Sequence, residues 1–199
     1  QSQKEEKMEV NIANLENQWS SVDWEFDTFT THGASAEEVK LLKMLDEDFE
    51  QLEADQLTVQ SMLGNRYMMT FEDQIHSWNS ALNNIADIFT LLGEIQGTWS
   101  YLEPLFVGSD EVKKELPEDA KRFVGVDQDL KVILKDATNT GNVKETCVVE
   151  GRFKKLEDIN ERLSLCKKSL KDFLSGKQRI FPRFYFVSEA QLLDLLSNG

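Results

Sequence analysis

Apolar residues recur every three or four positions along most of the chain, which is the spacing of one face of an α-helix. The first such stripe predicts an opening helix and consists of Met8, Ile12, Leu15, Trp19 and Val22. In residues 24–30 aromatic and acidic side chains alternate instead, which is the spacing of a strand. This segment therefore predicts a short strand or an extended link.

A second helix is predicted to begin near Ser35, because Glu38 follows it at the spacing of a capping box. Its apolar stripe is Val39, Leu42, Leu45, Phe49 and Leu52. A further helical piece is indicated by Val59, Leu63 and Tyr67. Gly64 weakens that piece, since glycine is a poor helix former.

The strongest period runs from Phe71 to Leu102. Its members are Phe71, Ile75, Trp78, Leu82, Ile85, Phe89, Leu92, Ile95, Trp99 and Leu102. A helix over this span would be about 48 Å long at ~1.5 Å per residue. Its large aromatic residues favour packing against several helices over a two-stranded coiled coil. Pro104 is predicted to end it, because proline lacks the amide donor and clashes with the preceding turn.

The chain after Val107 is predicted to form short helical pieces separated by Gly108, Ser109, Pro117 and Gly125, with Pro117 at a helix start. Another short helix is marked by Leu130, Ile133 and Leu134. The polar stretch DATNTGN, residues 136–142, predicts an exposed loop.

The last long helical stripe consists of Phe153, Leu156, Ile159, Leu163, Cys166, Leu170 and Phe173. Gly176 is predicted to end this helix, and Ser188 with Gln191 predicts the start of a leucine-rich one. The fold expected from these patterns is mainly all-α, an elongated multi-helix arm with a short extended or β segment near residues 24–30. Residues 1–199 are expected to form a single helical segment, with a subdivision into 1–106 and 107–199 left open.

Composition excludes several classes of protein. The net charge of −14, from 22 Lys and Arg against 36 Asp and Glu, argues against a general nucleic-acid surface. No apolar run approaches the ~18 residues of a membrane span and no signal-peptide pattern opens the chain, so we expect a soluble, cytoplasmic protein without a membrane partner. Because the sequence begins at Gln1 without a methionine, we expect a fragment or a processed piece.

Catalytic and metal-binding patterns are absent from the sequence. The nearest fragment to a phosphate loop, GEIQGTW from Gly93, has no lysine and lies within a helical stripe. His76 and His32 have no evident catalytic partner, and the carboxylates fall on the polar faces of predicted helices. Cys147 and Cys166 form no CxxC pair and are expected to be buried free thiols. We therefore expect no catalytic residue, no cofactor site and no metal site.

Aromatic residues are the remaining candidates for contact sites. Those at helical spacing, including Trp78, Phe89 and Trp99, are expected in the core. The run FPRFYF leaves two interpretations open, a clamp between its flanking helices or a contact for a partner, and Arg183 must find a partner or water. The candidate structural or contact residues are Trp99, Tyr101, Pro104, Phe106, Phe181, Pro182, Arg183, Phe184, Tyr185 and Phe186.

Three stretches of the sequence resemble dynein heavy chains, especially axonemal ones. The first is the run from Leu163 to Leu196, in which a helix bearing leucine and cysteine leads through a basic pair into FPRF and a serine-capped leucine helix. The segments TWSYLEPLF (98–106) and LPEDAKRFVGVD (116–127) are similar to the family's tryptophan-bearing segment and to the segment that follows it.

The resemblance implies the N-terminal half of the linker, the helical arm that lies across the ring of AAA+ modules. It implies a non-catalytic mechanical role, transmitting ATP-driven changes of the ring to the tail, with ATP and magnesium bound elsewhere in the parent chain. The implied partners are the ring, the remaining linker and, through the parent motor, the microtubule of a ciliary or flagellar axoneme.

Two other classes of function remain as alternatives. A helical scaffold or binding module of spectrin-like or solenoid type would also show these stripes and this acidic surface, but it would have a sequence repeat, and none stands out. A small autonomous enzyme would need a convergent polar constellation in a pocket.

Overall fold

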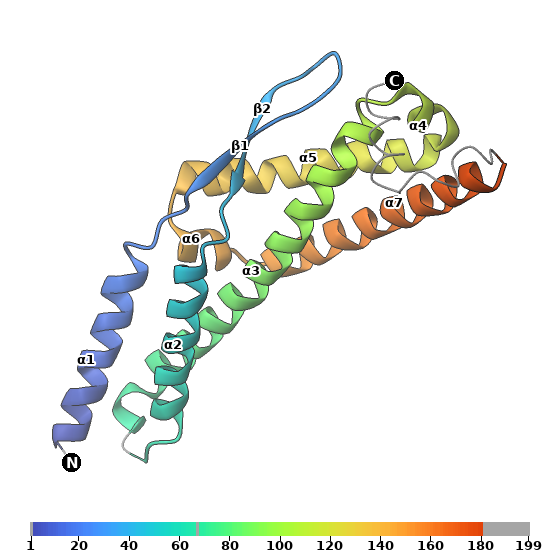
Figure 1. Cartoon of the computed structure of the whole chain (residues 1–199). Coiled ribbons are helices and arrows are strands. Elements are labelled where there is room, and N and C mark those ends of the chain that lie inside the picture. The colour runs from blue at the N-terminus through green and yellow to red at the C-terminus, as the bar shows by residue number, and fades with distance from the viewer. Residues whose placement is uncertain (1, 67, 181–199) are drawn as a thin grey trace.

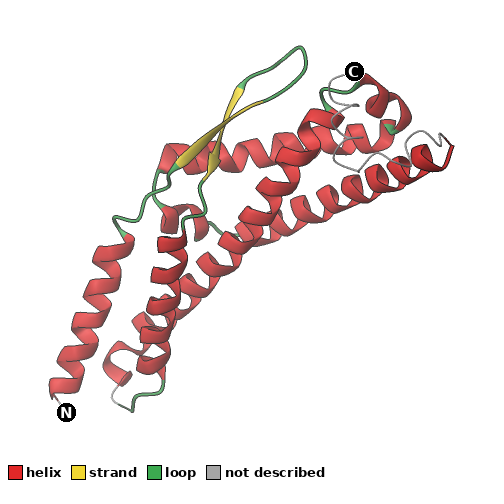
Figure 2. Cartoon of the chain, viewed as in Figure 1, coloured by secondary structure: helices red, strands yellow, loops and turns green. Residues whose placement is uncertain are grey.

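The computed structural model describes residues 2–66 and 68–180 and is an elongated arrangement of helices with one small β-hairpin (Figures 1 and 2). In chain order the elements are α1 (Ser2–Trp19), β1 (Phe26–Thr30), β2 (Glu38–Leu42), α2 (Asp46–Leu63), the 3-10 helix η1 (Met68–Phe71), α3 (Glu72–Phe106), α4 (Asp110–Glu115), α5 (Pro117–Thr140), α6 (Val143–Cys147) and α7 (Arg152–Ile180). The prediction of a mainly all-α arm with a short β segment near residues 24–30 is confirmed.

Helix α3 runs the length of the molecule (Figure 1). It has 35 residues, which corresponds to roughly 52 Å at 1.5 Å per residue. Helices α1 and α2 lie at its N-terminal end, and α5 and α7 cover its C-terminal half (Figure 1). The apolar stripe predicted for this helix is buried along its length, from Ile75 to Leu102. The long helix and its packing against several neighbours are therefore confirmed.

Large aromatic side chains fill the core beside α3. The rings of Trp24 and Phe89 lie 5.4 Å apart between centroids, and those of Phe49 and Phe89 lie 5.3 Å apart. Near the other end, Phe106 stacks on Phe123 of α5 at 5.6 Å. Because Phe89 contacts both the link before β1 and the start of α2, it joins the N-terminal elements to α3.

Strands β1 and β2 pair antiparallel, from Phe26 opposite Leu42 to Thr30 opposite Glu38. The helix predicted from the capping box at Ser35 and Glu38 is therefore wrong in its first part, and α2 begins only at Asp46. A stripe as short as Val39 and Leu42 fits either period. Pairing with β1 makes this segment a strand, because the paired strand gains backbone hydrogen bonds with a partner that the local pattern does not reveal.

Helix α2 continues without a break to Leu63, so Val59 and Leu63 belong to it and not to a separate piece. Gly64 caps its C-terminus, and Tyr67 lies outside the described residues.

Pro104 does not end α3 but lies in its last turn, since the helix continues to Phe106. Ser109 then caps the N-terminus of α4, where its hydroxyl accepts a hydrogen bond from the Val112 amide. The proline removes one backbone hydrogen bond to the preceding turn, but the ladder continues past it, because the amides of Val107 and Gly108 donate to the carbonyls of Glu103 and Pro104.

Helix α5 begins at Pro117 as predicted, but it is one continuous helix of 24 residues. Gly125 and the residues around Leu130 lie inside it, so the predicted short pieces are wrong. The exposed loop predicted for 136–142 is also wrong, because the helix reaches Thr140 and Asn142 is only 9% exposed. Burial of one face outweighs the ~1 kcal/mol that a glycine costs within a helix.

Helix α7 likewise continues past Gly176 to Ile180, so the predicted stop is wrong. The left-handed type of helix end needs a glycine with positive φ, and in the described residues the glycines with positive φ are Gly33, Gly141 and Gly151, not Gly176. The run FPRFYF and the predicted cap at Ser188 and Gln191 lie outside the described residues. None of the described helices is both long and apolar enough to span a membrane.

Candidate functional site at the hairpin junction

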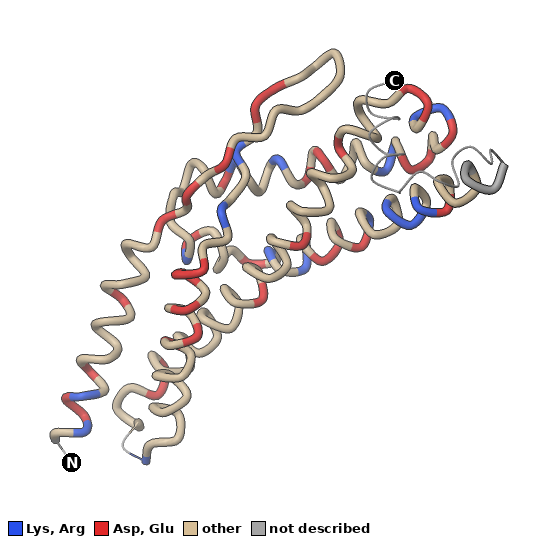
Figure 3. The backbone as a smooth tube through the Cα atoms, viewed as in Figure 1, with Lys and Arg blue, Asp and Glu red and all other residues tan. Residues whose placement is uncertain are grey.

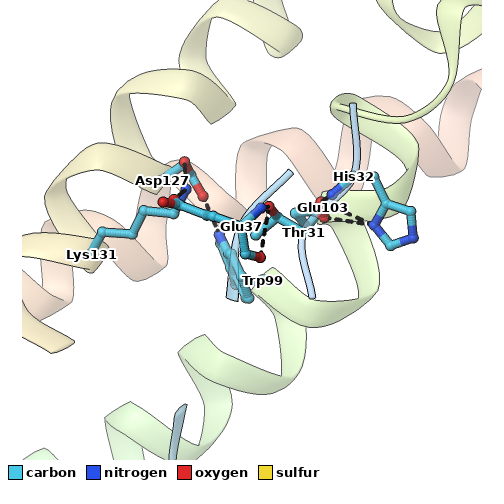
Figure 4. A network of polar contacts seen from close by, with 7 residues as sticks. All are labelled: Thr31, His32, Glu37, Trp99, Glu103, Asp127 and Lys131. Carbon is cyan, nitrogen blue, oxygen red and sulfur yellow. Dashed lines mark hydrogen bonds and ion pairs between the residues drawn. The ribbon is translucent and has the colours of Figure 1, made fainter. Parts of the chain in front are cut away.

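The hairpin crosses α3 and meets α5 through a polar network, which we call the hairpin junction (Figure 4). Its members are Thr31, His32, Glu37, Trp99, Glu103, Asp127 and Lys131. Glu103 and Trp99 lie one turn apart on α3, Asp127 and Lys131 lie one turn apart on α5, and the other three lie at the hairpin end. The junction therefore joins three elements that are distant in the sequence.

Glu103 is the buried charge of this junction, with a side chain only 1% exposed. One of its oxygens accepts the backbone N–H of His32, and Nδ1 of the same histidine lies 3.1 Å and 3.0 Å from the two carboxylate oxygens. A buried carboxylate is tolerated only when it is paired and hydrogen-bonded. The side chain of His32 is 48% exposed, so this contact holds the end of the hairpin against α3 at the edge of the core.

Trp99 connects the hairpin to α5. Its ring lies 4.8 Å from the Phe29 ring of β1, and its indole N–H donates to Asp127 Oδ1 at 2.8 Å. Lys131 then lies 2.8 Å from Asp127 Oδ2 and 2.8 Å from Glu37 Oε1. These contacts form a continuous path of hydrogen bonds and ion pairs from α3 through α5 back to the hairpin.

The ion pairs of Lys131 shift its own pKa and that of Glu37. The hydrogen bond and charge of Lys131 hold the pKa of Glu37 below its usual value. Burial lowers the pKa of Lys131, but the hydrogen bonds and charges of Asp127 and Glu37 outweigh it and raise the pKa overall. Glu37 and Lys131 are therefore both charged at neutral pH.

Gln96, two turns before Glu103 on α3, fixes the other end of the hairpin. Its side-chain carbonyl accepts the Leu42 amide at 2.8 Å, and its amide group donates to the Leu42 carbonyl at 2.9 Å. The side chain is buried, and both of its polar groups are satisfied. Gln96 and Glu103 thus hold the hairpin at two points along one helix.

A second polar group, the Asn142 cluster, consists of Trp19, Trp24, Asn142 and Thr146. The Asn142 side chain donates to the Trp19 carbonyl at 2.9 Å and accepts the Glu145 amide at 3.0 Å, which caps α6. The Trp24 indole donates to Thr146 Oγ1 at 3.0 Å. This cluster joins the link between α1 and β1 to the turn between α5 and α6.

The four described residues among the predicted contact candidates do not converge on one site. Trp99 lies in the junction, Phe106 lies in the core against Phe123, Pro104 lies in the last turn of α3, and Tyr101 is 37% exposed. Their role as contact residues stays a prediction. The other six, Phe181 to Phe186, lie outside the described residues.

Sequence reasoning missed the most connected polar residues. No catalytic partner was predicted for His32 and no role was predicted for Glu103, yet the two are paired in the junction, where Glu103 is buried and His32 is 48% exposed. Asp55 is a second buried carboxylate and accepts the Trp19 indole N–H at 2.9 Å. One signal was available for Asn142, since Glu145 follows it at the spacing of a capping box.

The other carboxylates mostly fit the prediction of solvated faces. Acidic residues gather along α2, and basic residues gather toward the C-terminal half of α7 (Figure 3). Asp48 of α2 is partly buried, and burial followed by the nearby Glu47 and Glu25 raises its pKa. Acidic residues thus predominate on α2 and basic residues on the C-terminal half of α7.

The described residues show no arrangement of three or more His, Cys, Asp and Glu side chains that could hold a metal ion. His76 is exposed and lies 3.8 Å from Glu72 one turn earlier. Cys147 and Cys166 are buried free thiols, as predicted. The two polar groups join elements that are distant in the sequence through hydrogen bonds and ion pairs, some of them buried.

Comparison with known proteins identifies a family over the whole chain. Residues 1–199 match the family model described as "Dynein heavy chain, N-terminal region 2". The chain is 46% identical over 198 residues to the dynein alpha chain of the flagellar outer arm from Chlamydomonas reinhardtii. It is 38% identical over 196 residues to a ciliary dynein beta chain from Tripneustes gratilla and 36% identical over 196 residues to dynein axonemal heavy chain 17 from Mus musculus.

These alignments cover 98–100% of the chain but only 4% of each relative. The chain therefore corresponds to a small part of proteins that are much longer.

Proposed function

The chain belongs to the dynein heavy chain family, in its N-terminal region 2, and on this premise we propose that residues 1–199 are the N-terminal half of the linker. In this role the segment is a non-catalytic mechanical element. It carries a conformational change of the ATP-hydrolysing ring toward the tail of the motor.

The observation that supports this proposal most is the hairpin junction. A segment that transmits force must keep its elements in register under load, and buried polar contacts fix register more strictly than apolar contacts do. Glu103 and Gln96 hold the hairpin at two points on α3, and Lys131 ties it to α5. The long α3 then extends this connection over much of the molecule (Figure 1).

We propose the properties of the parent protein from its relatives. ATP and magnesium would be bound in the ring, outside residues 1–199, and the microtubule would be reached through the parent motor. The partners of this segment would be the ring and the rest of the linker. Because the relatives are flagellar, ciliary or axonemal dyneins, we place the parent in the axoneme.

Within this proposal the segment acts as one unit. Helix α3 lies within the range 1–106 and packs against α7 of the range 107–199 as well as against α2, so the two ranges share one core. That arrangement favours a single segment over the subdivision at residue 106.

The test is to separate ATP hydrolysis from movement in a heavy chain that contains these residues. The variant Gln96→Ala with Glu103→Ala removes the two hydrogen-bonded attachments of the hairpin to α3. We expect ATPase activity to stay within twofold of the wild type while microtubule gliding velocity falls at least threefold. Glu94→Ala, an exposed change on the same helix, is the matched control and should change neither.

Unchanged gliding in the double variant would contradict the mechanical role of the junction. Loss of ATPase activity in equal proportion to gliding would instead indicate that the segment supports the ring's chemistry.

A further inference from the structure

Strand β2 has an outer edge whose backbone groups point away from β1. In an antiparallel pair only alternate residues exchange hydrogen bonds across the ladder. The Thr31 amide donates to the Glu37 carbonyl and the Lys43 amide to the Glu25 carbonyl, both at 2.8 Å. Residues 37, 39, 41 and 43 therefore face β1. The N–H and C=O groups of residues 38, 40 and 42 face the other way.

Gln96 already occupies part of this edge. Its side chain bonds both backbone groups of Leu42, which are the contacts that a third strand would make. Two residues earlier, the backbone of Lys40 has no such partner within the described part of the chain. On the outer edge of β2, the backbone groups of Leu42 are thus already hydrogen-bonded, and those of Lys40 are available to a third strand.

A groove of about 390 Å³ lies between this open edge and α5. Val39 on the strand side and Leu134 on the helix side give it an apolar lining, and both are buried. Lys40 lines the strand side and Lys135 the helix side. A volume of this size lies in the range of ligand pockets, and an open strand edge beside apolar side chains suits an extended peptide.

The charge of the groove indicates the charge of the peptide that would bind there. In a chain with a net charge of −14, its lining has three lysines against two glutamates. Lys131 is already paired with Glu37. Lys40 and Lys135 have no ion-pair partner in the described residues, and neither does Glu38 at the rim. The surplus positive charge favours a segment with carboxylates facing the two lysines.

We propose that this groove receives an extended, acidic segment of the same heavy chain, from outside residues 1–199, which adds to β2 as a third strand. Few hydrogen bonds and two exposed lysines give weak binding to a free peptide. A tethered segment overcomes this, because a linker raises its effective concentration to the millimolar range. The proposal rests on the family assignment and does not require the mechanical role proposed above.

The first test measures binding of a fluorescent peptide, Thr-Glu-Val-Glu-Val-Glu-Thr, to the 199-residue chain by anisotropy. We expect saturable binding with a Kd of roughly 0.1–1 mM. Lys40→Pro should weaken it at least tenfold, because proline has no N–H to donate. Lys40→Gln keeps the N–H and should weaken it two- to fivefold. A peptide with lysine in place of glutamate should bind at least tenfold more weakly.

Thr28→Pro is the matched control. Thr28 lies opposite Lys40 on β1, so its N–H points outward from the other edge, and the change removes an equivalent donor without touching the groove. Binding within twofold of the wild type is expected for this variant. Equal binding by Lys40→Pro and Thr28→Pro, preference for the lysine peptide, or no binding up to several millimolar would overturn the proposal.

The second test identifies the source of the segment. A carbodiimide cross-linker, which joins lysine directly to a carboxylate, is applied to a heavy chain that contains these residues. We expect Lys135 to be linked to an Asp or Glu of the same chain outside residues 1–199, and the link to be lost in Lys40→Pro but kept in Thr28→Pro. A link to another polypeptide alone would overturn the proposed source. Gliding velocity is not needed for either result.

Discussion

Replacing Asn142 by alanine should destabilise the protein strongly. The side chain caps α6 through the Glu145 amide and donates to the Trp19 carbonyl. Loss of an N-cap costs about 0.5–2 kcal/mol, and a buried carbonyl without a partner costs about 1–3 kcal/mol. Together these give a decrease of roughly 2–4 kcal/mol in the free energy of unfolding, or about 5–15 °C in Tm for a chain of this length.

The measurement is denaturant unfolding followed by tryptophan fluorescence, since Trp19 and Trp24 both belong to the Asn142 cluster. Asn139→Ala is the matched control, because Asn139 is exposed near the end of α5 and should change stability by less than about 0.5 kcal/mol. Asn142→Asp keeps the oxygen that caps α6 but loses the N–H donor, so its free energy of unfolding should lie between those of Asn142→Ala and Asn139→Ala. If Asn142→Ala unfolds at the same denaturant concentration as Asn139→Ala, the cluster does not hold these elements together.

Three further predictions concern α3, α5 and the cysteines. Glu103→Ala should lower the free energy of unfolding by about 1.5–3 kcal/mol, the usual worth of hydrogen bonds to a charged group, in the same assay; a change below 0.5 kcal/mol would contradict a structural role for the pair. Gly125→Ala should raise it by about 0.5–1 kcal/mol, since the added methyl group meets only an Arg162 side-chain nitrogen at 3.6 Å; a decrease in thermal stability would refute the continuous α5. Burial raises the pKa of Cys147 to about 12 and of Cys166 to about 11, from a usual 9.0. Between pH 9 and 11 the thiols of the unfolded chain therefore ionise before those of the folded chain, so the free energy of unfolding falls as the pH rises. In an alkylation assay at pH 8, the thiols of the folded protein should resist iodoacetamide until denaturant is added.

The long helices could be predicted from the sequence because each carries many turns of one apolar stripe. A stripe as long as that of α3 fits no other regular structure. The secondary structure of short segments could not be predicted in the same way. Val39 and Leu42 fit helix and strand equally, and the strand forms only because residues 26–30 lie beside them. The decision depends on pairing between segments, which a local pattern does not contain.

Glycines and prolines were over-interpreted for a related reason. Gly125, Gly176 and Pro104 all lie inside helices, because burial of the helix faces supplies more free energy than one unfavourable residue costs. The polar clusters were the least predictable part. Glu103 looks like any other acidic residue on a helix, and only the return of the hairpin onto α3 gives it His32 as a partner.

The continuity of α3 constrains how the gene for this segment can change. A single-residue deletion within an α-helix rotates everything beyond it by about 100° and shifts it by about 1.5 Å. In α3 such a deletion would turn either Gln96 and Glu103 or the Phe89 side of the helix away from their partners. Insertions and deletions should therefore be rare within α3 and concentrate at the exposed residues 34–36 of the turn between β1 and β2, where added residues extend into solvent.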